Sequence, residues 1–132
     1  MPLTATKPNL MQPDAPIALT EARLGQECGT WLNKHHRDAY AHFAHIPNGG
    51  LRTAREATAL KSQHVSPGYP DYLLDLPRGG YHGLRIELKT PTGQVAPEQR
   101  AWLARLTAAG FRCAVIRSLP AFIELLTDYL TA

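Results

Sequence analysis

Apolar residues recur along the chain with two different spacings, one typical of helices and one of strands. Leu24, Cys28 and Leu32 return every fourth position and mark one face of a helix that begins at Thr20, a good N-cap residue. Residues 83–89 instead alternate between apolar and polar, as the two faces of a strand require. Pro- and Gly-rich clusters separate such stretches and predict turns between them.

The same patterns divide the whole chain into helices and strands. We expect helices at 20–36, 52–64, 97–110 and 120–130, and strands at 40–46, 72–76, 83–89 and 112–117. Residues 1–17 carry several prolines and no periodicity, which predicts a flexible N-terminal tail before a folded domain at 18–132. Strands interleaved with helices over this length predict a single α/β domain.

Composition narrows the classes of protein that remain. With 44% hydrophobic and 19% charged residues, the chain has the balance of an ordinary globular domain. No apolar run reaches the roughly 18 residues of a membrane span, and the N-terminus lacks the apolar segment of a signal peptide, so we expect a cytoplasmic protein without a membrane partner. Cys28 and Cys113 are far apart and lie in apolar patterns, which predicts buried reduced thiols. The net charge of +3 permits nucleic-acid binding without requiring it.

A set of charged residues on two neighbouring strands is the main candidate for chemistry. Glu87 and Lys89 share one face of their strand, about 7 Å apart, a pattern that a solvated surface pair would also give. The preceding hairpin is symmetric about Gly79, which places Asp71 opposite Glu87 with Cβ atoms about 5 Å apart. A slip of one residue in register would turn Asp71 to the other face.

Two carboxylates this close are stable together only if they share a proton or a cation. Mg²⁺ suits such a site, because it takes one or two carboxylates and completes its shell with water and phosphate oxygens. Such an ion makes bound water more acidic and stabilises charge on a phosphate, and Lys89 could orient the water or neutralise that charge. The residues therefore indicate phosphodiester hydrolysis.

Longer segments carry a family resemblance. Pro70-Asp71 followed by Glu87-Leu88-Lys89 matches the signature of the PD-(D/E)XK nucleases. Residues 45–50, 59–61, 67–71, 81–89 and 97–99 together resemble the VRR-NUC domain of that superfamily, in the same order and with similar spacing. The resemblance covers about residues 20–117 and implies a restriction-endonuclease-like mixed β-sheet flanked by helices.

The resemblance also implies roles for individual residues. The implied metal ligands are Asp71, Glu87, the backbone carbonyl of Leu88 and Glu21, and the implied catalytic set is Asp71, Glu87, Lys89 and the supporting Gln99. Mg²⁺ is the implied cofactor, with Mn²⁺ as a substitute.

The first helix departs from the family pattern at one position. Family members often carry Gln one helical turn after the upstream acid, whereas this chain has Gly25 there, with Gln26 beside it. Glu27 therefore competes with Glu21 for the role of upstream acid.

Six residues are candidates for contact with DNA: His45, Asn48, Gly49, Arg52, Lys61 and Arg85. In the turn at 48–50, glycine would allow the backbone to approach a phosphate, although a plain turn has the same sequence. The arginines and the lysine could bind phosphates, or they could be solvated charges.

These features predict a Mg²⁺- or Mn²⁺-dependent, structure-selective DNA endonuclease. Stand-alone family members resemble Holliday-junction resolvases and act as homodimers, which suits a substrate with two strands to cut. The chain is too short to hold extra domains, so we expect this type and a branched or four-way-junction substrate. The alternatives are a non-catalytic nucleic-acid-binding module with the same fold, a nuclease for flaps or duplex, and a sequence-specific restriction-type nuclease.

Overall fold

The structure, a computed structural model, describes residues 20–47 and 53–132 of the chain. Within this part the chain forms α1 (Glu21–His35), α2 (Arg37–Tyr40), β1 (Phe43–His45), α3 (Ala54–Ser62), β2 (Tyr72–Leu74), β3 (Leu84–Leu88), α4 (Pro97–Ala108), β4 (Arg112–Ile116) and α5 (Leu119–Thr131). The predicted tail at 1–17 and the predicted DNA contacts Asn48, Gly49 and Arg52 lie outside the described residues.

The four strands form one mixed sheet in the order β1-β2-β3-β4. The first two pairings are antiparallel, and β3 runs parallel to β4 because α4 carries the chain back between them. Between β2 and β3, Tyr72 lies opposite Ile86 and Leu74 opposite Leu84. Continuing this register by one residue brings Asp71 opposite Glu87, so the register expected from the symmetry about Gly79 is confirmed.

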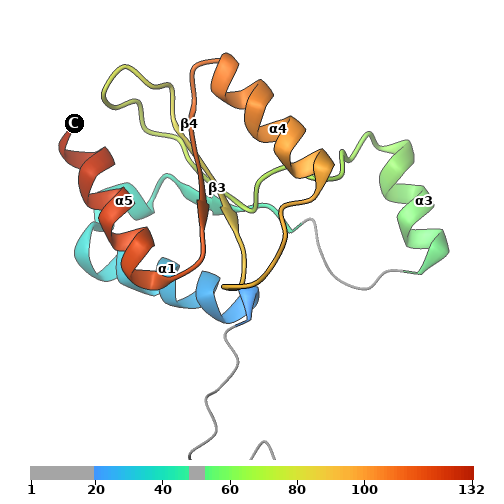
Figure 1. The fold of residues 1–132 in the computed structure, drawn as a ribbon, viewed down its shortest axis with the longest axis horizontal. Coiled ribbons are helices and arrows are strands. Elements are labelled where there is room, and N and C mark those ends of the chain that lie inside the picture. The colour runs from blue at the N-terminus through green and yellow to red at the C-terminus, as the bar shows by residue number, and fades with distance from the viewer. Residues whose placement is uncertain (1–19, 48–52) are drawn as a thin grey trace, which may run out of the picture.

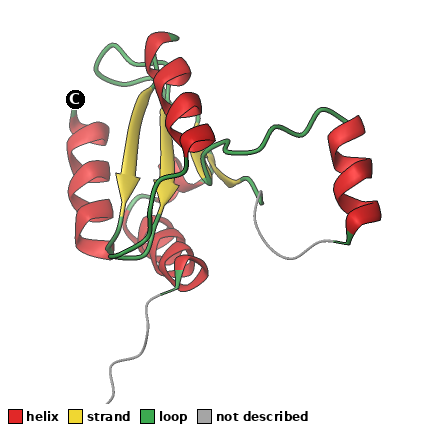
Figure 2. Ribbon diagram, turned by 45° about the vertical axis from the view of Figure 1, so that its right-hand side comes forward, coloured by secondary structure: helices red, strands yellow, loops and turns green. Residues whose placement is uncertain are grey.

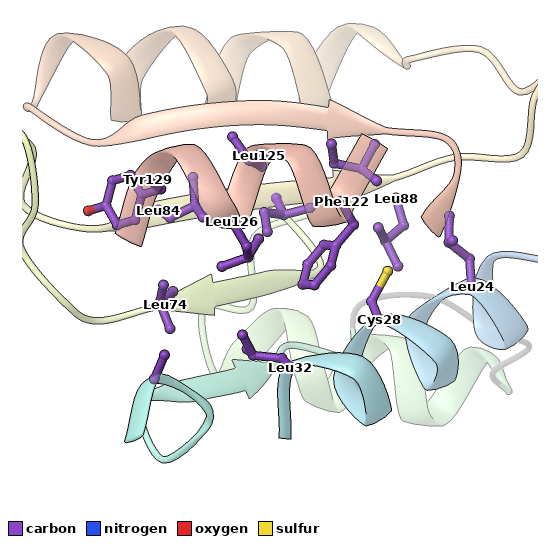
Figure 3. Packing of buried hydrophobic residues seen from close by; sticks show 13 residues of the cluster. Leu24, Cys28, Leu32, Leu74, Leu84, Leu88, Phe122, Leu125, Leu126 and Tyr129 are labelled. Carbon is purple, nitrogen blue, oxygen red and sulfur yellow. The ribbon is translucent and has the colours of Figure 1, made fainter. Parts of the chain in front are cut away.

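Helices cover both faces of the sheet (Figures 1 and 2). α1 and α5 pack against one face, where their apolar side chains meet Leu84, Ile86 and Leu88 of β3 in a single buried cluster (Figure 3). α4 packs against the other face, over β3 and β4. This is the predicted class of fold, a mixed sheet flanked by helices.

α1 follows directly from its sequence. The Thr20 side chain accepts a hydrogen bond from the Arg23 N–H at 3.0 Å, which caps the helix at its predicted start. The predicted apolar face of Leu24, Cys28 and Leu32 is buried against the sheet. The first turn of α1 is thereby held at the end of β3, and the Glu21 side chain is exposed there.

The segment before β1 differs from its prediction. A strand was expected at 40–46, but α2 forms first and the strand is limited to Phe43–His45. The small Ala39 is buried in the core, which favours one more helical turn before the chain enters the sheet. α3 was expected at 52–64 and is shorter, because Thr53 caps it in a capping box with Glu56. α3 buries none of its residues and lies to one side of the sheet (Figures 1 and 2).

Two further expectations concern the cysteines and the membrane. Cys28 and Cys113 are both free thiols, as expected, but only Cys28 is buried, and burial raises its pKa to about 12. Cys113 is partly exposed, so the expectation of burial is wrong for this residue. Among the described helices, none is both long and apolar enough to cross a bilayer.

Candidate active site

Asp71 lies immediately before β2 and is fixed by backbone groups from two neighbouring strands. Its Oδ2 accepts a hydrogen bond from the Leu88 N–H at 2.8 Å. Its backbone carbonyl accepts one from the Ile46 N–H at 2.7 Å, and the same oxygen lies 2.9 Å from Nδ1 of His45. The carboxylate of Asp71 is therefore held at the end of β3 by the strand pairing itself.

Glu87 is among the most deeply buried side chains of the described chain, at 1% exposure. Its Oε2 accepts a hydrogen bond from Nε2 of Gln99 at 2.9 Å and lies 4.0 Å from Nζ of Lys89. Its Oε1 is buried and has no hydrogen-bond partner among the described residues. A buried carboxylate oxygen without a partner is costly, so this position favours an additional positively charged group.

The burial of β3 corrects one reading of the sequence. Glu87 and Lys89 were equally consistent with a solvated surface pair, but both are buried, Lys89 at 8% exposure. The reason is that α4 covers the polar face of β3 as α1 and α5 cover its apolar face.

The electrostatics of Glu87 follow from this burial. Removal from water raises the pKa of Glu87 to about 8, and the nearby carboxylate of Asp71 acts in the same direction. Lys89 lowers the pKa, and Glu21 raises it. Without a further cation, the raised pKa favours a proton shared within the Asp71–Glu87 pair.

Gln99 connects the first turn of α4 to this carboxylate. Its Oε1 accepts the Ala96 N–H at 2.7 Å, which satisfies a backbone donor at the start of the helix. This bond orients the amide so that its Nε2 donates to Glu87. Gln99, the supporting glutamine implied by the family resemblance, thus lies against the carboxylate of Glu87.

An open cleft of about 390 Å³ lies beside these residues. We call it the carboxylate cleft; it is lined by Glu21, Ala22, Gln26, His45, Pro47, Asp71, Tyr72 and Leu88. Glu87 and Lys89 do not line it.

The structure separates the two candidates for the upstream acid. Glu21 lines the carboxylate cleft and is close enough to affect the pKa of Glu87. Glu27 instead pairs with Arg23 at 3.3 Å and lines a different hollow, beside Trp31. The geometry therefore favours Glu21 as the third acidic group of the site.

The donor set fits a hard divalent cation with an incomplete protein shell. Among the described residues, no group of three or more His, Cys, Asp or Glu side chains is placed to hold a metal on its own. The available groups are the carboxylates of Asp71 and Glu87, one of them with an unpartnered oxygen, and Leu88 at the cleft. Mg²⁺ commonly binds in this way, through one or two carboxylates, with water and substrate oxygens completing its shell.

The predicted DNA contacts are not all placed at this cleft. His45 is exposed and lines it. Lys61 is exposed on α3, away from the sheet (Figure 1).

Arg85 does not point to the surface, because its side chain is only 9% exposed. Its guanidinium donates to the Tyr69 hydroxyl and to Asp75, and lies 4.3 Å from the ring centre of Phe111. We therefore assign Arg85 a packing role and no phosphate contact.

Tyr72, Gln26 and Pro47 line the cleft and were not among the predicted site residues. Tyr72 has a signal in the sequence, since it directly follows Asp71 and turns to the opposite face of the sheet, towards α1. Its hydroxyl occupies the space that a side chain at Gly25 would need. This contact explains why the helix has glycine where the family often has glutamine.

The mixed sheet brings Asp71, Glu87 and Lys89 together at the end of β3, where Asp71 also lines the carboxylate cleft, and this arrangement is typical of a nuclease-type domain, whose substrate is nucleic acid. The comparisons agree with this class. The VRR-NUC domain model matches residues 17–120, and the chain belongs to the VRR-NUC family.

A solved structure of a VRR_NUC domain protein is similar over most of its length, with a TM-score of 0.76 and 26% sequence identity. The match covers 87% of this chain and 91% of the solved one. No match was found among curated proteins.

Proposed function

We propose that this protein is a Mg²⁺- or Mn²⁺-dependent endodeoxyribonuclease that cuts branched or otherwise structured DNA. The observation that carries the proposal is the buried Glu87 carboxylate, which has one oxygen without a partner and faces the carboxylate of Asp71. A protein that only bound DNA would have no need for acidic groups gathered beside an open cleft, since they repel phosphate.

Each residue of the site has a distinct role in the proposal. Asp71 and Glu87 would hold the cation, together with the backbone carbonyl of Leu88, and Glu21 would complete the shell directly or through water. The cation would supply a more acidic water and would stabilise negative charge on the phosphate. Lys89 would orient the attacking water or neutralise charge on the phosphate, and Gln99 would keep Glu87 in position.

A homodimer acting on four-way junctions is the form that we propose for the active protein. Two copies related by twofold symmetry present two such sites, which matches a substrate with two strands to cut. Sedimentation of the protein alone and with a junction measures this directly, and a monomer in both cases would contradict it.

The test of activity is cleavage of a four-way junction, a flap and plain duplex with Mg²⁺ or with EDTA. Lys89→Met keeps most of the buried aliphatic stem but removes the charge, and we expect kcat to fall at least about 100-fold. Lys34→Met, at an exposed position in the last turn of α1, is the matched control and should cut like wild type. Full activity of a folded Lys89→Met variant would rule out the proposed role.

The metal ligands have matched controls as well. Asp71→Asn should abolish Mg²⁺-dependent cutting, whereas Asp75→Asn, at a side chain that is 61% exposed, should not. Glu21→Gln should weaken Mn²⁺ binding in calorimetry, and Glu27→Gln should leave it unchanged. The reverse result for this last pair would assign the upstream acid to Glu27.

The rival class is a nucleic-acid-binding module without catalysis. It predicts salt-sensitive DNA binding that is indifferent to Mg²⁺, and no cutting under any condition. Binding and cutting measured on the same preparation separate the two classes.

A further inference from the structure

A second hollow of about 380 Å³ adjoins the carboxylate cleft, between α1 and the strands β1 and β2. We call it the aromatic hollow. Gly25 and Gly29 of α1 bound it on one side. On the other side it is bounded by Tyr40 at the end of α2 and by Phe43, His45 and Tyr72 of the sheet. Gln26, His45 and Tyr72 line the hollow and the carboxylate cleft alike, so the two spaces are direct neighbours.

The sheet side of the hollow is a row of aromatic rings. Phe43 and Tyr72 are stacked, with centroids 5.0 Å apart and planes 10° from parallel. Tyr40 extends the row beyond Phe43, with centroids 6.4 Å apart, and His45 lies 4.6 Å from Tyr72 at the end nearer Asp71. The row therefore runs from an exposed tyrosine to the residue that contacts the Asp71 carbonyl.

The helix side of the hollow is open at Gly29. A Cβ atom added at Gly29 would meet nothing within 4 Å. The rim is polar but uncharged, with Gln26, Thr30 and Asn33 supplying amide and hydroxyl groups. Among the described residues that line the hollow there is no Asp, Glu, Lys or Arg, so neither a phosphate nor a metal cation is the natural occupant.

Phe43 and Tyr72 stack on each other, so the ring faces left for a ligand are those at the two ends of the row, on the exposed Tyr40 and His45. A flat ring with hydrogen-bonding groups at its edge would stack on such an end ring and meet the polar rim. We propose that the aromatic hollow binds an unpaired nucleobase next to the phosphate held in the carboxylate cleft. This inference rests on the proposed function for the position of that phosphate. Stacking on aromatic side chains is how proteins commonly hold unpaired bases without sequence preference. A base within a duplex is already paired and stacked, so the hollow would give the enzyme a preference for DNA with unpaired nucleotides.

Binding of two single-stranded probes tests the inference without any cutting. The first is a ten-residue oligothymidylate, and the second has ten abasic residues with the same phosphates; both are measured by fluorescence anisotropy with Ca²⁺ present. Wild type should bind the base-bearing probe at least about fivefold more tightly, the low end of one stacking interaction. Equal affinity for the two probes, or no binding of either, would overturn the inference.

Variants that fill the hollow provide the second arm. Gly29→Trp places a large side chain in the open space and should remove the preference for bases, whereas Gly29→Ala should keep it. Asn33→Trp, at an exposed rim position, is an independent blocking variant should the first fail to fold. Retention of the preference in a folded blocking variant would contradict the proposal. Conversion of a dimer to a monomer by these variants would also contradict it, because a second copy would then occupy the hollow.

Cleavage assays on the same wild-type preparation distinguish this inference from the proposed function. Metal-dependent cutting without a preference for bases would support the nuclease proposal and refute base binding in the aromatic hollow. A preference for bases without any cutting would leave a base-binding hollow in a protein that is not a nuclease.

Discussion

Glu87 is the fully buried carboxylate of the candidate site. Its side chain is removed from water, faces another carboxylate, and is held by only one amide donor and one ammonium group at 4.0 Å. Burial and the Asp71 carboxylate disfavour its ionised form, whereas the amide donor and the ammonium group favour it. A divalent cation would reverse the balance, because it favours both carboxylates in their charged form.

The pKa of Glu87 leads to a pH dependence of stability. Burial raises it to about 8, whereas in the unfolded chain a glutamate titrates near 4.3. Between these values the folded protein keeps a proton that the unfolded chain has released. The stability from this group is therefore full below about pH 4.3 and is lost as the pH rises towards 8.

The Glu87→Gln variant lacks this titration. In EDTA, its free energy of unfolding minus that of wild type should increase steadily from pH 5 to pH 8. Urea denaturation at several pH values measures the difference. Parallel pH profiles for the two proteins would show that Glu87 is ionised in the folded state throughout this range.

Gln99 offers a test of positioning as distinct from catalysis. Gln99→Leu removes the donor to Glu87 Oε2 while keeping a side chain of similar size. Loss of a group that orients a metal ligand typically costs 10- to 100-fold in metal affinity or activity. We expect a loss of that size in Mn²⁺ affinity by calorimetry, with recovery of activity at high Mn²⁺ concentration.

Gln94→Leu, at an exposed position before α4, is the control and should bind Mn²⁺ like wild type. If Gln99→Leu binds Mn²⁺ with unchanged affinity, the amide bond to Glu87 has no role in holding the metal ligand.

The sequence predicted which site residues lie opposite each other, because strand pairing determines this. The symmetry about Gly79 was enough to place Asp71 opposite Glu87. The burial of Glu87 and Arg85 was not predictable, because alternation shows that two faces exist but not that both are covered. That depends on the packing of α4, a contact between elements distant in sequence.

At the scale of elements, the first turn of α1 and its glycine-containing turns border different hollows. Its first turn presents Glu21 to the carboxylate cleft, and its next turns leave space at Gly25 and Gly29. The space at Gly25 is filled by Tyr72, whose ring and hydroxyl would clash with an added Cβ. The space at Gly29 is open.

Alanine substitutions at these two glycines should therefore have opposite effects. Gly29→Ala should stabilise the protein by about 0.5–1 kcal/mol, because alanine is the better helix former and meets nothing. Gly25→Ala gains the same propensity but forces Tyr72 from its stacked position, at a cost of about 1–3 kcal/mol.

Chemical denaturation of both variants measures the contrast, and Tyr72→Phe in the Gly25→Ala background should recover part of the loss. Equal stabilities for the two alanine variants would show that the hydroxyl of Tyr72 does not fill the space at Gly25.

The elements themselves were predictable wherever the pattern was long. The helices α1, α4 and α5 and the strands β3 and β4 lie within one or two residues of their predicted ends. The region of α2 and β1 was not predictable, because the apolar residues within 37–46 follow neither a clear helical nor a clear strand spacing. The short helix there depends on the burial of Ala39, a tertiary effect.

At the scale of the whole molecule, the fold brings the proposed groups together from both sides of the sheet. α1 supplies Glu21 from one side, α4 supplies Gln99 from the other, and the strands supply Asp71 and Glu87 between them. The aromatic hollow continues from this point along α1. Phosphate chemistry and recognition of an unpaired base would thus take place in neighbouring hollows.

The most direct measurement of the central claim is a crystal grown with Mn²⁺ and analysed by anomalous scattering at the manganese edge. The account predicts a peak between the carboxylates of Asp71 and Glu87, with Lys89 beside it and the Leu88 carbonyl among the ligands. Absence of a peak there, or manganese bound only at other residues, would contradict the proposed metal-dependent nuclease.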